Sequence, residues 1–95
     1  MKDESYLRIK YSTLFNKQFK AAPLEIKIAF REARQLFYDN PNYPYLRNHA
    51  LKEKFAGFSS IDVTGDWRAL FKIRKTKRQT VITFHILGTH TQLYG

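Results

Sequence analysis

Two histidines and an aspartate in the second half of the chain have side chains that could carry out acid–base chemistry: His49, Asp66 and His90. Histidine has an ordinary pKa that lets it accept and donate protons near neutral pH. The plainer interpretation is that such common residues occur here by chance and share no site. They predict a metal-free catalytic group if the fold brings a loop, a turn and the C-terminal tail together.

The charge of the chain is strongly positive and unevenly placed. Seventeen Lys and Arg residues stand against eight Asp and Glu, which gives a net charge of +9 with the histidines neutral. No acidic residue follows Asp66, whereas lysines and arginines continue to Arg78. Charge of this size and asymmetry favours a polyanionic partner, such as RNA, DNA, the ribosome or an acidic protein. The alternative is a basic protein whose charge serves only solubility.

An RNA partner would give the acid–base group a reaction. Cleavage of RNA needs one group to take the 2′-hydroxyl proton, another to protonate the leaving 5′-oxygen, and a cation for the charge that develops on phosphorus. Arg68, with Lys52 or Lys54, could supply this cation. The residues that we expect to contact RNA or the ribosome are Lys52, Lys54, Trp67, Lys72, Arg74, Lys75, Lys77 and Arg78. Trp67 alternatively anchors the core.

Other classes of site lack their sequence signals. The chain has no cysteine, so it can form neither a disulfide framework nor a thiolate metal site. Its four glycines do not form a phosphate-binding loop, and its histidines lack metal-ligand spacing. We therefore expect no metal and no cofactor.

The apolar residues are not arranged for a membrane. No run of about 18 apolar residues occurs, so no membrane-spanning helix is expected. Residues 1–5 lack the basic start and apolar centre of a signal peptide. A cytoplasmic protein without a membrane partner is the simplest expectation.

Two helices are predicted in the first half of the chain. Tyr6 to Tyr11 alternates between apolar and polar residues, which is typical of a strand with one buried face. Ser12 or Thr13 can then cap a short helix. Pro23 suits the first turn of a second helix, whose apolar residues from Ile26 onwards recur at steps of three and four. A Pro-rich segment at residues 40–44 ends it.

The second half predicts a long loop and three strands. The loop extends to about Lys54, and the strands cover residues 55–63, 67–73 and 80–87. The first two strands are joined by Thr64-Gly65-Asp66, where glycine would supply the backbone angles of a tight hairpin turn. Residues 88–95 form a tail. The whole chain, 1–95, is predicted to be one α+β domain of order β-α-α-β-β-β, with two helices packed on an antiparallel sheet.

Several short segments resemble the YafQ branch of the RelE/ParE toxin superfamily. They are His49-Ala50-Leu51, Gly57-Phe58, Asp66-Trp67 at the head of an apolar strand, and Gly88-Thr89-His90-x-x-Leu93-Tyr94. The tail motif, with Asp-Trp upstream of it, is the specific part of the likeness. The N-terminal half resembles the family only in the order of its elements.

This resemblance implies the toxin of a type II toxin–antitoxin system, a ribosome-dependent mRNA interferase that cuts mRNA in the ribosomal A site. It also implies a cognate antitoxin that binds and neutralises it in a hetero-oligomer. By motif, His49, Asp66 and His90 match residues that serve acid–base catalysis in the family. Tyr94 falls where an aromatic ring lies near the substrate base, and Arg68 where RelE-type toxins carry an arginine.

Two positions depart from the family pattern and leave alternatives open. Asp62 stands where the family usually has a second histidine, and Ile86 where it usually has an arginine. One alternative is a ParE-like toxin that inhibits its target by binding, although ParE-type chains generally lack this set of histidines and aspartate. Another is a catalytically weakened toxin that only binds RNA or its antitoxin.

Overall fold

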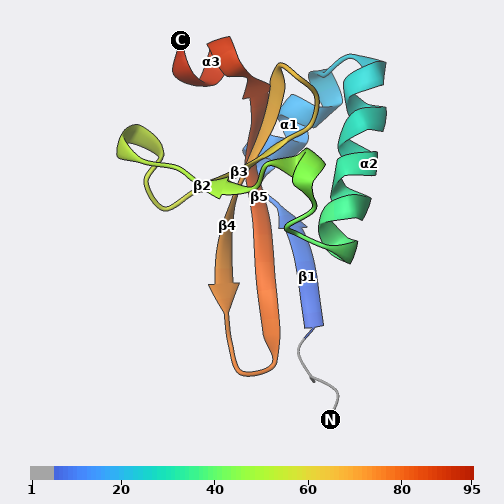
Figure 1. The fold of residues 1–95 in the computed structure, drawn as a ribbon. Helices are drawn as coiled ribbons and strands as arrows, with labels where there is room; N and C mark the ends of the chain where they lie inside the picture. The colour runs from blue at the N-terminus through green and yellow to red at the C-terminus, as the bar shows by residue number, and fades with distance from the viewer. Residues whose placement is uncertain (1–5) are drawn as a thin grey trace.

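The computed structural model describes residues 6–95, and Figure 1 shows their arrangement. The segment 1–5, which lacks the features of a signal peptide, lies outside the described residues. The longer elements are β1 (Tyr6–Tyr11), α1 (Thr13–Ala21), α2 (Leu24–Asp39), β3 (Ser59–Asp62), β4 (Trp67–Lys75) and β5 (Gln79–Thr89). The short ones are the 3₁₀ turns η1 (Pro44–Leu46) and η2 (Glu53–Phe55), strand β2 (His49–Ala50) and helix α3 (His90–Tyr94).

The two long helices begin where the sequence predicts. The Ser12 side chain accepts a hydrogen bond from the backbone N–H of Phe15 and so caps α1. Pro23 is the residue before α2, where its missing N–H leaves no donor unpaired. The apolar stripe of α2 is buried at Ile26, Phe30, Ala33 and Phe37. This helix therefore gains its stability mainly from packing of one face.

The strands form one sheet in the order β1-β5-β4-β3-β2. All neighbours are antiparallel except β1 and β5, which are parallel. The predicted fold class is thus confirmed, with a mostly antiparallel sheet in place of a purely antiparallel one. The parallel pair arises because the two helices return the chain across the sheet before the antiparallel strands bring β5 beside β1.

The core lies between the helices and one face of the sheet. The core cluster combines Phe15 of α1 and the buried residues of α2 with sheet residues that include Ile61, Ala69, Phe71 and Phe84. Side chains alternate along a strand, and Ile61 pairs with Ala69 on this face. The next pair, Asp62 and Arg68, therefore lies on the opposite face, away from α1 and α2. None of the helices within residues 6–95 is long and apolar enough to cross a membrane.

Several local predictions need correction. The strand expected over residues 55–63 is β3 alone, because η2 and the left-handed Gly57 (φ 94°) turn the chain before it. The β3–β4 connection spans residues 63–66, and Gly65 does not have the positive φ expected of it. Thr64 shapes that connection instead, since its hydroxyl accepts from the N–H groups of Asp66 and Trp67.

The C-terminal tail is also not irregular, because it ends in helix α3. Thr89 and Gln92 form a capping box in which each side chain accepts from the other residue's backbone N–H. The capping box was readable in the sequence as Thr-x-x-Gln and was overlooked there. Strands β4 and β5 also run further than predicted, so the basic segment after residue 73 forms a hairpin that projects from the body (Figure 1).

Candidate active site

His49 lies in β2 at the edge of the sheet, opposite Ser60 of β3. The turn before it places Arg47 in the left-handed region, with φ 49°, directly after the buried Leu46. The Nδ1 atom of His49 lies 2.7 Å from the carbonyl oxygen of Arg47. Because a carbonyl can only accept, Nδ1 must carry the hydrogen. The other ring nitrogen, Nε2, is then left to exchange a proton with a ligand.

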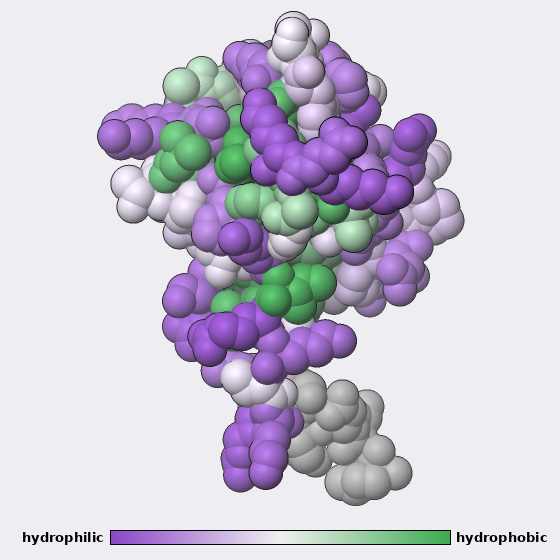
Figure 2. Space-filling view, turned by 90° about the vertical axis from the view of Figure 1, so that its left-hand side faces the viewer, coloured by the Kyte–Doolittle hydropathy of each residue, from purple (hydrophilic) through white to green (hydrophobic). Residues whose placement is uncertain are grey.

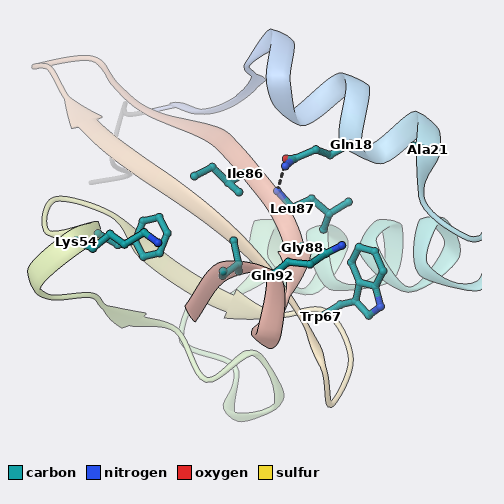
Figure 3. A pocket seen from close by; sticks show the side chains of 10 residues that line it. Gln18, Ala21, Lys54, Trp67, Ile86, Leu87, Gly88 and Gln92 are labelled. Atoms are coloured by element: carbon teal, nitrogen blue, oxygen red, sulfur yellow. Dashed lines mark hydrogen bonds between the residues drawn. The ribbon is translucent and has the colours of Figure 1, made fainter. Parts of the chain in front are cut away.

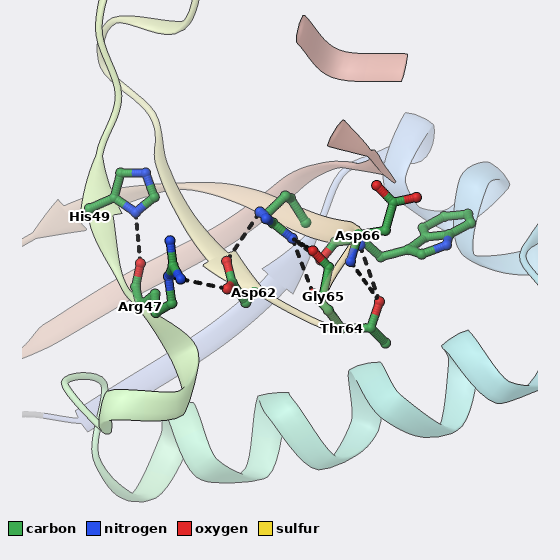
Figure 4. Close-up of polar contacts among 8 residues, drawn as sticks. Arg47, His49, Asp62, Thr64, Gly65 and Asp66 are labelled. Carbon is green, nitrogen blue, oxygen red and sulfur yellow. Dashed lines mark hydrogen bonds and ion pairs between the residues drawn. The ribbon is translucent and has the colours of Figure 1, made fainter. Parts of the chain in front are cut away.

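Asp62 is held between two arginines (Figure 4). Its Oδ1 lies 3.1 Å from Nε of Arg68, and its Oδ2 lies 3.4 Å from Nε of Arg47. The Arg68 pair is mostly buried, since each side chain is 15% exposed, whereas the Arg47 side chain is 73% exposed. The contact of Oδ1 is an ion pair without hydrogen-bond geometry. The aspartate charge at this position is therefore compensated within the fold.

His90 is fixed by the start of α3. Its backbone N–H donates to the carbonyl oxygen of Asp66 at 2.8 Å, which ties the C-terminal helix to the β3–β4 connection. Leu93 is buried beneath the helix. Gly88 allows the Gln92 side chain of α3 to pack closely against the end of β5, because a Cβ at residue 88 would lie 3.1 Å from it.

Tyr94 lies one helical turn after His90 and packs beside it. The two ring centroids are 4.7 Å apart with a tilt of 49°. On its other side, Tyr94 meets the edge of Phe55 from η2, with centroids 5.7 Å apart. These contacts restrict the positions of both rings, although Tyr94 remains 42% exposed.

Four of the predicted catalytic residues border one open cavity of about 310 Å³, namely His49, Arg68, His90 and Tyr94. Its lining also includes Arg47, Asp62 and the buried Ser60, whose hydroxyl has no partner within residues 6–95. A loop strand, two central strands and the C-terminal helix thus converge on the sheet face that α1 and α2 leave open. Within the described residues, no group of three or more His, Asp or Glu is placed to bind a metal.

Asp66 does not line this cavity. Its carboxylate is exposed and points away from Asp62 and His49 (Figure 4). Asp66 contributes to the site through its backbone carbonyl oxygen, which accepts a hydrogen bond from the His90 N–H. The structure therefore brings Asp66 to the tail but does not bring its carboxylate to the other predicted catalytic groups.

Lys54 and Trp67, two of the predicted RNA contacts, line a different cavity of about 530 Å³ (Figure 3). This cavity lies between α1 and the C-terminal segment, where Leu87 N–H donates to Gln18 Oε1 at 2.7 Å. Trp67 is half-buried and packs against the core cluster. Ile86 also lines this cavity, so the position at which the resemblance implies an arginine does not border the cavity of the two histidines.

Lys72 joins a small cluster on the outer face of the sheet. Its Nζ lies 4.6 Å from the ring centroid of Phe58, and the Phe58 ring meets His85 edge to face at 5.6 Å. Burial, and secondly the positive charge of Lys72, lower the pKa of His85 from its ordinary value of 6.5. His85 is thus packed between β5 and Phe58 and does not line the cavity of His49 and His90.

The remaining predicted RNA contacts are exposed. Arg74, Lys75, Lys77 and Arg78 lie at the end of the β4–β5 hairpin, and Lys52 precedes η2. Figure 2 shows the hairpin as a hydrophilic projection from the body. The turn is held by Thr76, whose hydroxyl accepts from the N–H groups of Arg78 and Gln79. Exposed cations on this hairpin are available to a polyanion.

Sequence reasoning overlooked Arg47 as a site residue. It precedes His49 by two positions in a segment expected to be an irregular loop. Its left-handed backbone and its contact with Asp62 depend on tertiary packing, so no local pattern indicated them. The only available signal was a basic residue close to a candidate catalytic histidine.

The fold is shared with solved toxins. YafQ from E. coli strain BL21(DE3) superimposes with a TM-score of 0.73 and 25% identity, covering 92% of this chain and 97% of that one. A YoeB/ParE toxin from Agrobacterium tumefaciens gives a TM-score of 0.71 at 10% identity, covering 87% and 98%. A chain of the E. coli DinJ–YafQ toxin–antitoxin complex gives 0.64 at 22% identity, covering 92% and 96%.

No protein-family model matches the chain, and no curated protein matches it. The structural likeness defines the class: the chain has the small α+β fold of the RelE toxin superfamily. Within that class it is YafQ-like, since the likeness to YafQ extends over nearly the whole of both chains.

Proposed function

We propose that this chain is the toxin of a type II toxin–antitoxin pair and that it cleaves mRNA on the ribosome. The observation that carries the proposal is the convergence of His49 and His90, from β2 and α3, on one open cavity that also holds arginine side chains. The toxins among its structural neighbours support the toxin role. A net charge of +9 supports a nucleic-acid substrate.

The two histidines can provide both proton transfers of RNA cleavage. One takes the proton of the 2′-hydroxyl, and the 2′-oxygen then forms a bond to the adjacent phosphorus. The P–O5′ bond breaks, and the other histidine donates a proton to the leaving 5′-oxygen. The products are a 2′,3′-cyclic phosphate and a 5′-hydroxyl. Nδ1 of His49 is occupied by the Arg47 carbonyl, so Nε2 is its exchanging atom.

Other residues assist this pair in the proposal. Tyr94 lies against His90 and offers a ring on which the neighbouring base can stack. Asp66 positions His90 through its carbonyl group. The exposed cations of the β4–β5 hairpin, together with Lys52, Lys54 and Trp67, contact ribosomal RNA or mRNA. No metal or cofactor takes part in the reaction as proposed.

A cognate antitoxin is the expected protein partner. One structural neighbour is part of a DinJ–YafQ toxin–antitoxin complex, which supports a hetero-oligomer of the same kind here. Because ribosomes and mRNA are the proposed targets, the toxin would act in the cytoplasm.

A second candidate function is inhibition by binding alone. Asp62 places a carboxylate in the cavity, and Ile86 supplies no cation there. A ParE-like toxin or a weakened nuclease that retains RNA or antitoxin binding would tolerate both features. This candidate predicts growth arrest without new RNA ends.

The test is cleavage of mRNA on purified ribosomes, with the RNA ends identified chemically. Wild type should cut within translated codons and leave a cyclic phosphate. His49→Ala and His90→Ala should each lower the cleavage rate by about 10²–10⁴-fold, the usual contribution of an acid–base group. His85→Gln is the matched control, since His85 lies outside the cavity. Full cleavage by both alanine variants would refute the assignment, and arrest without cleavage would favour binding alone.

A further inference from the structure

We infer that Arg47, rather than Arg68, is the residue that binds the scissile phosphodiester, and that Asp62 positions it. This inference rests on the proposed function, because it names the phosphate-binding group of the same cavity. It differs from the sequence-based expectation, in which Arg68 supplies the cation. The reason is the different engagement of the two guanidinium groups.

The guanidinium of Arg68 is already committed to the protein. Its Nε faces Asp62 at 3.1 Å, and its side chain is 15% exposed. Its Nη1 donates to the carbonyl oxygens of Thr64 and Gly65, each at 3.1 Å. It also donates to the carbonyl oxygen of the preceding residue, Trp67, at 3.2 Å. Turning this group toward a phosphate would remove its hydrogen bonds to the carbonyls of Thr64 and Gly65. Arg68 therefore serves to hold the β3–β4 connection.

The guanidinium of Arg47 is free by comparison. Its ion pair with Asp62 is made by Nε at the longer distance of 3.4 Å, and the side chain is 73% exposed. An arginine has five N–H donors, and within residues 6–95 the Nη groups of Arg47 have no protein acceptor. Both Nη groups can therefore donate to two oxygens of one phosphate.

The backbone of Arg47 couples this cation to the catalytic histidine. Its carbonyl oxygen fixes the Nδ1 hydrogen of His49, and Figure 4 shows the Arg47 side chain between His49 and Asp62. The backbone of Arg47 is left-handed, with φ 49°. In this conformation its carbonyl faces His49 while its side chain faces Asp62. A phosphate bound by Arg47 would thus lie in the cavity that His49 also lines, within the site of the proposed proton transfer.

The charges of the cavity agree with an anionic ligand. Asp62 is shared by two arginines, so its single negative charge leaves one positive charge over. The other basic candidates are placed elsewhere: Lys54 stacks over Phe55 in the larger cavity, and Lys52 does not line the smaller one. Ile86, at the position where the resemblance implies an arginine, does not border this cavity, and Arg47 supplies a cation to it.

The experiment measures single-turnover mRNA cleavage on ribosomes at saturating toxin. Arg47→Ala should lower the rate by about 100-fold, as expected when one charge-stabilising donor is lost. Arg47→Lys should recover part of it, because lysine keeps the charge but not the paired donors. Added ethylguanidinium should partly rescue Arg47→Ala. Arg31→Ala, which changes an exposed arginine on α2, is the matched control and should cleave like wild type.

Two further readouts distinguish phosphate binding from a structural effect. Sulfur replacement of one non-bridging oxygen at the scissile phosphate should slow wild type more than Arg47→Ala, since only wild type makes the contact. Asp62→Asn should lower the cleavage rate when Arg47 is present, and it should lower the rate less when Arg47 has already been replaced by Ala. Urea unfolding should show that Arg47→Ala remains as stable as wild type.

The outcomes separate this inference from the proposed function. If Arg47→Ala cleaves at the wild-type rate while His49→Ala is inactive, Arg47 does not bind the phosphate and the nuclease assignment stands. If Arg47→Ala is slow but shows the full sulfur effect and no rescue, the role of Arg47 is structural and the inference is wrong. If wild type produces no cleavage on ribosomes, both proposals fail.

Discussion

Asp62 and Arg68 face each other across β3 and β4, with Oδ1 and Nε 3.1 Å apart and both side chains 15% exposed. The carboxylate stands at a position where the resemblance implies a histidine, in a cavity proposed to receive a phosphate. Its negative charge is compensated by two ion pairs, a shorter one with Arg68 and a longer one with Arg47. The acidic residue is therefore part of a charge arrangement that retains a positive balance and does not by itself exclude an anionic substrate.

Arg68→Ala should lower the free energy of unfolding by about 1–3 kcal/mol, because it removes the ion-pair partner of the mostly buried Asp62 and the hydrogen-bond donor to the carbonyls of Thr64 and Gly65. The measurement is urea unfolding followed by the fluorescence of Trp67, the single tryptophan of the chain. Arg74→Ala, an exposed change further along the same strand, should leave stability within about 0.5 kcal/mol of wild type. Equal stability of the Arg68 variant and wild type would show that the pair does not support the connection.

Thr89→Ala should loosen α3, because the threonine side chain accepts the N–H of Gln92 in the capping box. Loss of an N-cap costs about 0.5–2 kcal/mol of helix stability. Hydrogen exchange at Leu93 and Tyr94 should become faster, and His90-dependent cleavage should fall while the core stays intact. Thr91→Ala is the control within the same helix, since Thr91 is exposed and its side chain takes no part in the capping box of Thr89 and Gln92. If the two variants exchange alike, the capping box is not what orders the helix.

His85→Gln should make stability less dependent on pH on the acidic side. The pKa of His85 is lowered in the folded protein, mainly by burial, from an ordinary value of 6.5. The unfolded chain therefore binds the proton more readily. The stabilisation by neutral His85 is complete above pH 6.5 and is lost as the pH falls through the lower folded-state pKa.

Urea midpoints measured between about pH 7.5 and pH 5 would test this, with wild type losing more stability than His85→Gln. Lys72→Met should raise the pKa of His85 toward its ordinary value, as followed by the ring proton shifts in NMR, because it removes the nearby positive charge. An identical pH dependence of wild type and His85→Gln would contradict the prediction.

Lys77→Glu combined with Arg78→Glu should weaken ribosome binding and reduce its salt dependence. Both side chains are exposed at the hairpin turn, so the fold should be unaffected. Each lost phosphate contact lowers the slope of log K against log salt by roughly 0.7–0.9. The same charge reversal at Lys17 and Lys20, exposed on α1, should change binding less. Equal effects at the two places would mean that net charge matters and the hairpin does not.

The sequence by itself determined the elements that rest on local patterns. The alternation from Tyr6 to Tyr11, the capping Ser12 and the apolar period of α2 correspond to β1, α1 and α2 with nearly the predicted bounds. Such patterns involve residues a few positions apart, whose burial follows from the geometry of a helix or strand. The family motifs likewise indicated the RelE-like fold that the structural likeness shows.

Tertiary structure alone decided which side chains share the cavity. His49, Arg68 and His90 are far apart in sequence, and they meet because β2, β4 and α3 are placed by sheet order and register. The left-handed turn at Arg47 depends on packing around Leu46, and the outward Asp66 carboxylate depends on the Thr64 connection. Contacts between distant segments are set by the packing of the whole core, which no local pattern contains.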